Sequence, residues 1–150
     1  MALADQLHAD TILLSPEVDD KWALLEQMVD AVAKAGLLDA NRVSEAKAAL
    51  IARERSVSTG MEDGVAVPHA ALENLDKMVA ALALFPAGIE FDSMDAKPAR
   101  VVVMLLVPRH EKLAHVRTLT EIARRLRDAV FRERLLQAAT GAAAVALWAE

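Results

Sequence analysis

The seven residues at 101–107, VVVMLLV, are apolar at every position. A strand with one face in water alternates apolar and polar residues, whereas a strand covered on both faces is apolar throughout. Turn residues (Asp-Ala-Lys-Pro) at 95–98 come just before the run, so we predict a strand over 99–107. Such a strand needs a layer on each side, which favours a layered fold built around a sheet.

Two helices are predicted on the N-terminal side of this strand. Ser15 and Pro16 are typical of a helix start, and apolar residues then recur at helical spacing until Gly36, a typical stop. Asp39 is a candidate cap for a second helix that continues to about Arg55.

The rest of the chain alternates predicted strands and helices. Short strands are expected at 65–67 and 78–85, and a Pro-Ala-Gly turn at 86–88. Helices are expected over 113–126 and from Asp128 onward, with a last Ala-rich turn or two after Gly141. The order of these elements predicts one layered α/β domain over residues 1–150.

Composition excludes several classes of protein. The chain has no cysteine, so it has no disulfides, thiolate metal ligands or thiol catalysis. A net charge of −5 and an aromatic content of 3% argue against nucleic-acid binding. No apolar run approaches the roughly 20 residues of a membrane span, and the N-terminal residues do not resemble an export signal. We therefore expect a cytoplasmic protein with no membrane insertion.

Common catalytic motifs are also absent. The sequence has no Gly-x-Ser-x-Gly, no phosphate-binding or dinucleotide-binding glycine motif and no His-Glu-x-x-His. His110 and His115 would point about 140° apart on a helix, so no metal site is expected. His8 and His110 are expected to be solvated. His115 follows a buried strand at the start of a helix, which suits a ligand site and a helix-surface residue equally.

His69 has the strongest context of the four histidines. Pro68 ends the predicted strand at 65–67 and sets the direction of the chain beside the imidazole. Gly60 and Gly64 allow the preceding loop to bring backbone amides close to a ligand. His69 is therefore the first candidate for a working residue.

The residues upstream of His69 suit a phosphoryl group. Arg53 supplies a permanent cation, and Ser58 and Thr59 supply hydroxyls. A neutral imidazole nitrogen can attack phosphorus directly, and the protein then has to position the group and spread its charge. This set of residues favours carrying a phosphoryl group over cutting a bond.

Three blocks of the sequence resemble a known family. Arg53-Glu54, Ser58-Thr59-Gly60 and the segment from Gly64 to Pro68-His69 are similar to the phosphorylation-site signature of the fructose/mannitol-type enzyme IIA domains (EIIA type 2) of the bacterial phosphotransferase system. The similarity continues through 91–98 and the strand that ends at Pro108. It ends with His115 and the amphipathic helix that follows, and it covers about residues 10–140.

The resemblance implies an α/β domain with a mixed sheet and helices on both faces. It implies that His69 accepts a phosphoryl group from the histidine phosphocarrier HPr or its nitrogen-branch paralogue. His115 would steady the ring and the phosphoryl group, Arg53 would add positive charge, and no cofactor would be needed. Such a protein is a component of a phosphotransferase rather than an enzyme acting on small molecules.

Within the family, the sequence is most similar to the nitrogen-regulatory branch, whose phosphorylation state is read by targets such as potassium transport systems and sensor kinases. Two alternatives stay open. One is a sugar-specific subunit that passes phosphate to a IIB cysteine, and the other is a binding module that has lost phosphoryl exchange. Glu62 and Asp63 make one loop more acidic than is usual in the family, and we expect both to face solvent or a basic donor.

Overall fold

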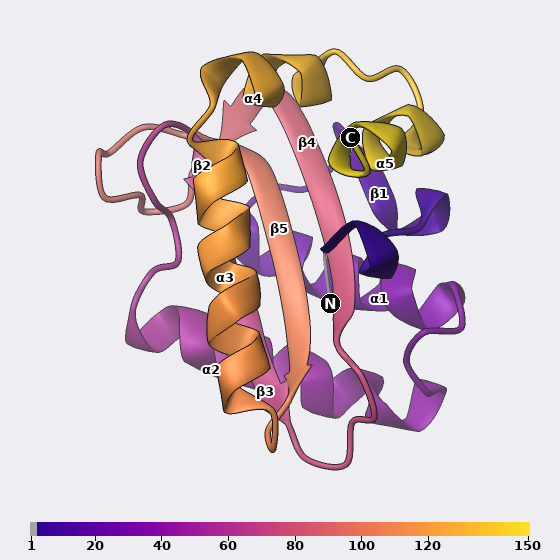
Figure 1. The fold of residues 1–150 in the computed structure, drawn as a ribbon. Coiled ribbons are helices and arrows are strands. Elements are labelled where there is room, and N and C mark those ends of the chain that lie inside the picture. The colour runs from indigo at the N-terminus through magenta and orange to yellow at the C-terminus, as the bar shows by residue number, and fades with distance from the viewer. Residues whose placement is uncertain (1–2) are drawn as a thin grey trace.

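The computed structural model describes residues 3–150; the first two residues of the predicted domain, Met1 and Ala2, lie outside the described part. Its strands form one mixed sheet in the order β1-β4-β5-β2, with β3 also paired to β5 (Figure 1). The strands are β1 (Ile12–Leu14), β2 (Val65–Ala66), β3 (His69–Leu72), β4 (Val79–Ile89) and β5 (Ala99–Pro108). β4 and β5 are antiparallel, and the other pairs are parallel. The predicted α/β class and the mixed sheet are confirmed.

Helices cover both faces of the sheet. One core contains buried residues of α1 and α2, and the other contains buried residues of α3, α4 and α5 (Figure 1). These helices are α1 (Lys21–Lys34), α2 (Val43–Ser56), α3 (Lys112–Leu126), α4 (Ala129–Leu136) and α5 (Gly141–Trp148). Short 3-10 helices occur at η1 (Leu3–Gln6), η2 (Ala9–Thr11) and η3 (Ala40–Arg42). The fold therefore has the three layers that the sequence predicted.

The apolar run at 101–107 forms most of β5 and is buried along its whole length. Val102, Met104 and Leu106 belong to the core beneath α1 and α2. The alternate residues belong to the opposite core; they are Val101, Val103, Leu105 and Val107. Because side chains of a strand alternate between faces, both faces of β5 must be apolar. The prediction of a strand covered on both sides is confirmed.

The predicted start of the first helix is wrong. Ser15 directly follows the edge strand β1 with a φ of 45°, and its N–H donates to Leu84 O on β4 at 2.8 Å, so it does not start a helix. The helix begins at Lys21, where the Asp20 side chain accepts from Ala23 N–H at 2.9 Å. Asp39 makes no side-chain cap either, because η3 comes before α2. The stop near Gly36 is confirmed, since α1 ends at Lys34.

Two predictions about the strands also need correction. The Pro-Ala-Gly segment at 86–88 lies within β4 rather than in a turn, because a shift in register between Leu84 and Ile89 accommodates it. Pro68 interrupts the 65–72 strand without ending it. β2 and β3 follow one line along β5, and Pro68 O accepts from Leu105 N–H at 3.0 Å between them. His69 thus begins a strand that stays in the sheet.

The C-terminal helices begin where the sequence indicates. Asp128 accepts from Val130 and Phe131 N–H groups at the start of α4, and Thr140 accepts from Ala143 N–H at the start of α5. Across residues 3–150, every helix is too short or too polar to cross a membrane.

Candidate functional site

His69, on β3, and His115, in the first turn of α3, lie side by side although they are 46 residues apart in the sequence. Their ring centroids are 5.1 Å apart and their planes meet at 69°, an edge-to-face arrangement. β5 connects the two histidines in space, because His69 pairs with Leu105 on β5 and α3 follows directly after that strand. The residues alone did not predict this pairing; the family resemblance implied it.

The imidazole of His69 is held by the backbone. Its Nδ1 lies 2.8 Å from Val67 O, and because a carbonyl oxygen only accepts, Nδ1 carries the proton of the neutral ring. The lone pair of the neutral ring is then on Nε2. A single hydrogen bond therefore sets both the tautomer and the orientation of the ring.

Both histidines are biased toward the neutral form. Burial lowers the pKa of His69, and Arg53 lowers it further, while the Val67 carbonyl and Glu54 oppose the shift. Burial also lowers the pKa of His115, and the neighbouring His69 adds to that effect. A neutral His69 keeps its Nε2 lone pair at physiological pH, as a nucleophile requires.

These shifts predict an acid-sensitive fold. The folded protein binds these protons more weakly than the unfolded chain. The two histidines therefore do not reduce the free energy of unfolding above the ordinary histidine pKa of 6.5, and they reduce it increasingly as the pH falls below that value. Urea unfolding at about pH 7.5 and about pH 5.5 measures the difference, in a window above most carboxyl titrations. The His69→Gln/His115→Gln protein should show a smaller decrease. An equal decrease in both proteins would contradict the prediction.

Arg53, Ser58 and Thr59 are engaged in different ways. Arg53 Nη1 donates to Val57 O at 2.8 Å, and its charge is close enough to lower the pKa of His69. The Ser58 hydroxyl donates to Phe91 O at 2.7 Å and accepts from Gly60 N–H. The buried Thr59 hydroxyl donates to Glu54 at 2.5 Å. Both hydroxyls therefore hold the 58–64 loop in place, and a direct contact with a phosphoryl group stays a prediction.

The two glycines shape the same loop. Gly64 has a φ of 75°, and its carbonyl accepts from Arg100 and Val101 N–H groups where β5 begins. Gly60 lies against the 91–94 segment, and its carbonyl accepts from Met94 N–H at 3.2 Å. A Cβ on Gly60 would lie 2.7 to 2.9 Å from atoms of Ser93 and from Phe91 O. Gly60 is needed for this close approach, and contact of either amide with a ligand stays a prediction.

The Gly60→Ala protein should therefore be less stable than the wild type. The added methyl group meets backbone atoms of Ser93 and Phe91 that cannot rotate away, so we expect a loss of about 1–3 kcal/mol in the free energy of unfolding. Urea unfolding monitored by circular dichroism measures this loss. Unchanged stability would mean that the 91–94 segment yields to the methyl group at no cost.

Glu54 and Lys21 are functional candidates that sequence patterns did not predict. Both are almost fully buried, and Lys21 Nζ lies 3.1 Å from Glu54 Oε2. Charged residues in a helical pattern usually indicate a solvated face, so nothing local marked either residue. The only available signal was that Glu54 follows Arg53 directly in the block that resembles the family signature.

The other candidates lie elsewhere. His8 and His110 are exposed, as predicted, and His110 faces Glu111 at 3.8 Å. Glu62 and Asp63 are also exposed, as expected. Within residues 3–150, no group of three or more His, Asp or Glu side chains is placed to hold a metal ion.

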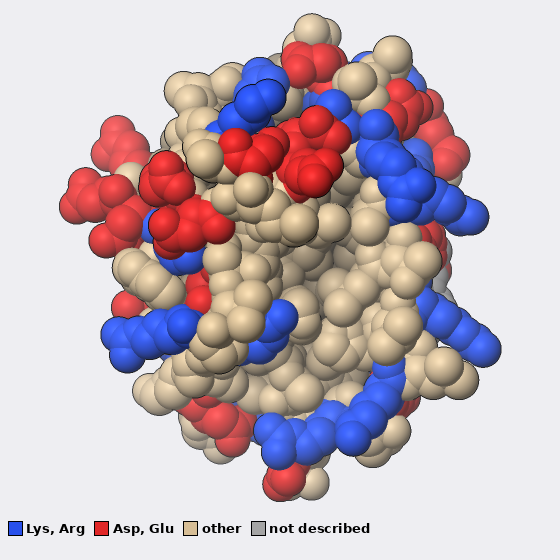
Figure 2. Space-filling view, turned by 90° about the vertical axis from the view of Figure 1, so that its left-hand side faces the viewer, with Lys and Arg blue, Asp and Glu red and all other residues tan. Residues whose placement is uncertain are grey.

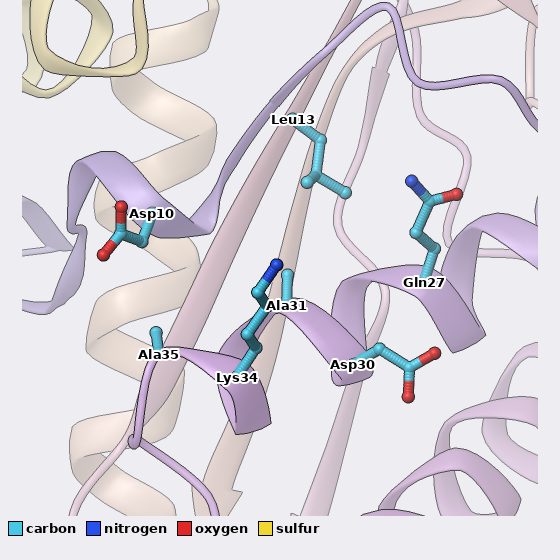
Figure 3. Close-up of a pocket in the computed structure, with 7 residues that line it drawn as sticks. All are labelled: Asp10, Leu13, Gln27, Asp30, Ala31, Lys34 and Ala35. Carbon is cyan, nitrogen blue, oxygen red and sulfur yellow. The ribbon is translucent and has the colours of Figure 1, made fainter.

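A cavity of about 530 Å³ lies between α1 and the segment that leads into β1 (Figure 3). Its lining includes Asp10, Gln27 and Lys34, and it contains none of the predicted site residues. Cavity size therefore does not mark the histidine site. A smaller cavity of about 160 Å³ does include His115 in its lining, together with Met78 and Thr118.

The chain is similar to known proteins over most of its length. The family model described as "Phosphoenolpyruvate-dependent sugar phosphotransferase system, EIIA 2" matches residues 5–150. A nitrogen regulatory protein of Bradyrhizobium diazoefficiens is 33% identical over 128 residues, which is 85% of this chain and 82% of that protein. The fructose-specific EIIA component of Haloferax volcanii is 39% identical over 104 residues, 67% of this chain and 68% of that one.

The fold has a close counterpart among solved structures. The crystal structure of nitrogen regulatory protein IIA-Ntr from Neisseria meningitidis superposes with a TM-score of 0.87 at 26% sequence identity. The match covers 97% of this chain and 98% of that one. With a family model that matches nearly the whole chain and relatives above 30% identity, the chain belongs to the EIIA type 2 family of the phosphoenolpyruvate-dependent sugar phosphotransferase system.

Proposed function

We propose that residues 1–150 act as one phosphoryl-carrier domain that accepts a phosphoryl group on Nε2 of His69. The observation that carries this proposal is the histidine pair. His69 donates from Nδ1 to Val67 O and keeps its lone pair on Nε2, and the ring of His115 lies 5.1 Å away. Membership of the EIIA type 2 family supports the same chemistry.

The transfer needs no proton and no cofactor. The Nε2 lone pair attacks the phosphorus of a phosphohistidine on the donor, and the N–P bond of the donor breaks as the new one forms. The electron pair of the broken bond returns to the donor imidazole. The donor ring leaves as a neutral imidazole because its other nitrogen carries a proton. The proton on Nδ1 of His69 stays where it is, so the phosphorylated ring carries a formal positive charge next to the phosphoryl dianion and still donates to Val67 O.

His115 and Arg53 are proposed to stabilise the transferred group. Phosphoryl transfer places charge on three oxygens, so fixed donors and cations close to the nucleophile lower the barrier. His115 is adjacent to His69, and its Nε2 is buried with no hydrogen-bond partner in the described part of the chain. Arg53 is held through Val57 O and adds a permanent positive charge.

The donor is proposed to be a phosphocarrier of the HPr type. Figure 2 looks onto the side of the molecule that carries α2 and the neighbouring loops, and it shows a largely uncharged region with Asp and Glu side chains, mixed with some Lys and Arg, above it and Lys and Arg side chains below. Four large apolar side chains are exposed in α3 and in the segments that follow α2 and β4: Leu113 and Val116 lie next to His115 in the sequence of α3, Val57 follows α2, and Met94 follows β4. An apolar surface with a charged rim suits a transient protein partner.

Within the family, we propose the nitrogen-regulatory role, in the cytoplasm, with target proteins that read the phosphorylation state of His69. Similarity to nitrogen regulatory proteins over most of both chains supports this role. Potassium transport systems and sensor kinases are the kinds of target that we propose. The second candidate is a sugar-specific IIA that passes phosphate to a IIB cysteine, which the similarity to a fructose-specific EIIA component favours.

Labelling with two competing donors tests the proposal. The protein is incubated with phosphoenolpyruvate, enzyme I and either the sugar-branch or the nitrogen-branch HPr. We expect one acid-labile phosphoryl group per chain and faster labelling by the nitrogen-branch donor. Faster labelling by the sugar-branch donor, with onward transfer to a IIB cysteine, would support the second candidate. No labelling by either donor would reject phosphoryl carriage and leave a binding module.

A further inference from the structure

A buried ion pair that is hydrogen-bonded to Thr59 is not used by the proposed chemistry. Lys21, at the start of α1, and Glu54, near the end of α2, are 5% and 3% exposed. Their charged atoms are 3.1 Å apart, and Lys21 Nζ also contacts the Asp92 carboxylate at 2.9 Å and Phe91 O at 3.4 Å. Burial alone lowers the pKa of Lys21, but the Asp92 and Glu54 carboxylates outweigh it and raise that pKa, so Lys21 is charged.

Stability alone does not account for this pair. Burying two charges costs about as much as their attraction returns, and apolar side chains of similar volume often serve the fold equally well. The carboxylate of Glu54 also has further partners. Its Oε2 accepts from Thr59 N–H at 2.9 Å, and its Oε1 accepts from the Thr59 hydroxyl at 2.5 Å. Glu54 therefore holds Thr59 by both its backbone and its side chain.

Thr59 in turn is bonded to the segment that carries His69. The carbonyl of Thr59 accepts from Val67 N–H at 3.2 Å, and Val67 O accepts from Nδ1–H of His69 at 2.8 Å. The bridge between Gly60 and Ala66 supports the same alignment. A continuous chain of hydrogen bonds thus runs from the Glu54 carboxylate through Thr59 and Val67 to the imidazole.

We propose that Glu54 is a positioning residue for His69, which acts through Thr59 and Val67 to hold the ring in its Nδ1–H tautomer with Nε2 free to accept a phosphoryl group. Lys21 balances the buried carboxylate and ties it to Phe91 O, which also accepts from Ser58. The part of this inference that concerns transfer rests on the proposed function; the part that concerns the tautomer does not.

Three variants test this series of hydrogen bonds, one at Glu54 and two at Thr59. Glu54→Gln removes the charge and keeps the shape, Thr59→Val removes the hydroxyl, and Thr59→Ser keeps it. Glu45→Gln is the matched control, because Glu45 lies on the same helix but is exposed and pairs with Arg42. Nitrogen-15 NMR of the unphosphorylated protein reports the tautomer of His69, and labelling by the HPr-type donor reports the transfer rate.

We expect Glu54→Gln and Thr59→Val to populate both His69 tautomers and to slow transfer about 10- to 100-fold, as loss of an orienting partner does for other functional histidines. Thr59→Ser and Glu45→Gln should retain the wild-type tautomer and stay within about twofold of the wild-type rate. Glu54 and Thr59 act through the same series of hydrogen bonds, so their effects on the transfer rate should not multiply. The Glu54→Gln/Thr59→Val protein should therefore transfer at about the rate of the slower single variant.

A wild-type tautomer together with a wild-type rate in Glu54→Gln and Thr59→Val would overturn the inference. A Glu54→Gln protein that melts at lower temperature, but whose folded fraction keeps the wild-type tautomer of His69 and the wild-type transfer rate, would also overturn the inference. Glu54 would then only stabilise the fold. If Glu54→Gln does not fold, Thr59→Val decides, since it leaves the ion pair intact. If the wild-type protein accepts no phosphoryl group, the proposed function fails, whereas the NMR result still decides whether Glu54 sets the tautomer.

Discussion

The His69→Ala protein is expected to lose more than about a thousandfold in the rate of phosphoryl labelling, because the substitution removes the attacking atom itself. His69 is the histidine whose Nδ1 is bound to Val67 O and whose pKa is lowered by both burial and Arg53. His115 is a poor substitute, since its Nε2 is buried. Labelling with radioactive phosphoenolpyruvate, enzyme I and the donor measures the effect.

The controls separate the nucleophile from its surroundings. His110→Ala changes an exposed histidine outside the pair and should be labelled at the wild-type rate. His115→Ala should still be labelled, about 10- to 1,000-fold more slowly, as when one stabilising group is removed from a site of developing charge. Wild-type labelling of a correctly folded His69→Ala protein would mean that the acceptor has been assigned to the wrong residue.

The Leu106→Ala protein is expected to lose about 2–5 kcal/mol in the free energy of unfolding. Leu106 lies on β5 with 0% of its surface exposed, in the core that α1 and α2 cover. Both neighbouring strands flank it, since it pairs with Val79 on β4 and Ala70 on β3. Because strands on both sides hold the backbone, the site has little freedom to collapse around the cavity. Urea unfolding of both proteins measures the loss.

Leu113→Ala is the matched control, because it is the same substitution at a side chain that is 66% exposed at the start of α3. We expect a change within about 0.5 kcal/mol, as at most surface positions. Similar losses for the two variants would contradict the assignment of β5 to the centre of the core.

Local patterns predicted the elements that depend mainly on their own residues. The all-apolar run at 101–107 forms a strand with a core on each face, and the stripe over 113–126 forms α3. Asp128 caps α4 through its own side chain. In each case the decisive contacts lie within a few residues or follow from the requirement to bury apolar surface.

The incorrect boundaries depend on distant partners. Ser15 and Pro16 are typical of a helix start when considered alone. In the structure, however, Ser15 N–H donates to Leu84 O on β4, and the helix begins only at Lys21. The segment at 86–88 is a good turn in isolation, but β4 continues through it by shifting its register against β5. The pairing of strands outweighs local preference in both places, and one sequence window cannot contain that information.

By itself, the sequence determined the α/β class, the buried central strand and the chemistry expected of His69, because apolar periodicity and a local motif carry that information. Only the tertiary structure decided what surrounds the imidazole. β5 brings His69 against His115, the Thr59 hydroxyl turns to Glu54 rather than outward, and Lys21 and Glu54 meet in the interior from two different helices. The physical reason is that a charge can be buried only beside its partner, and which residues become partners depends on how the helices pack on the sheet.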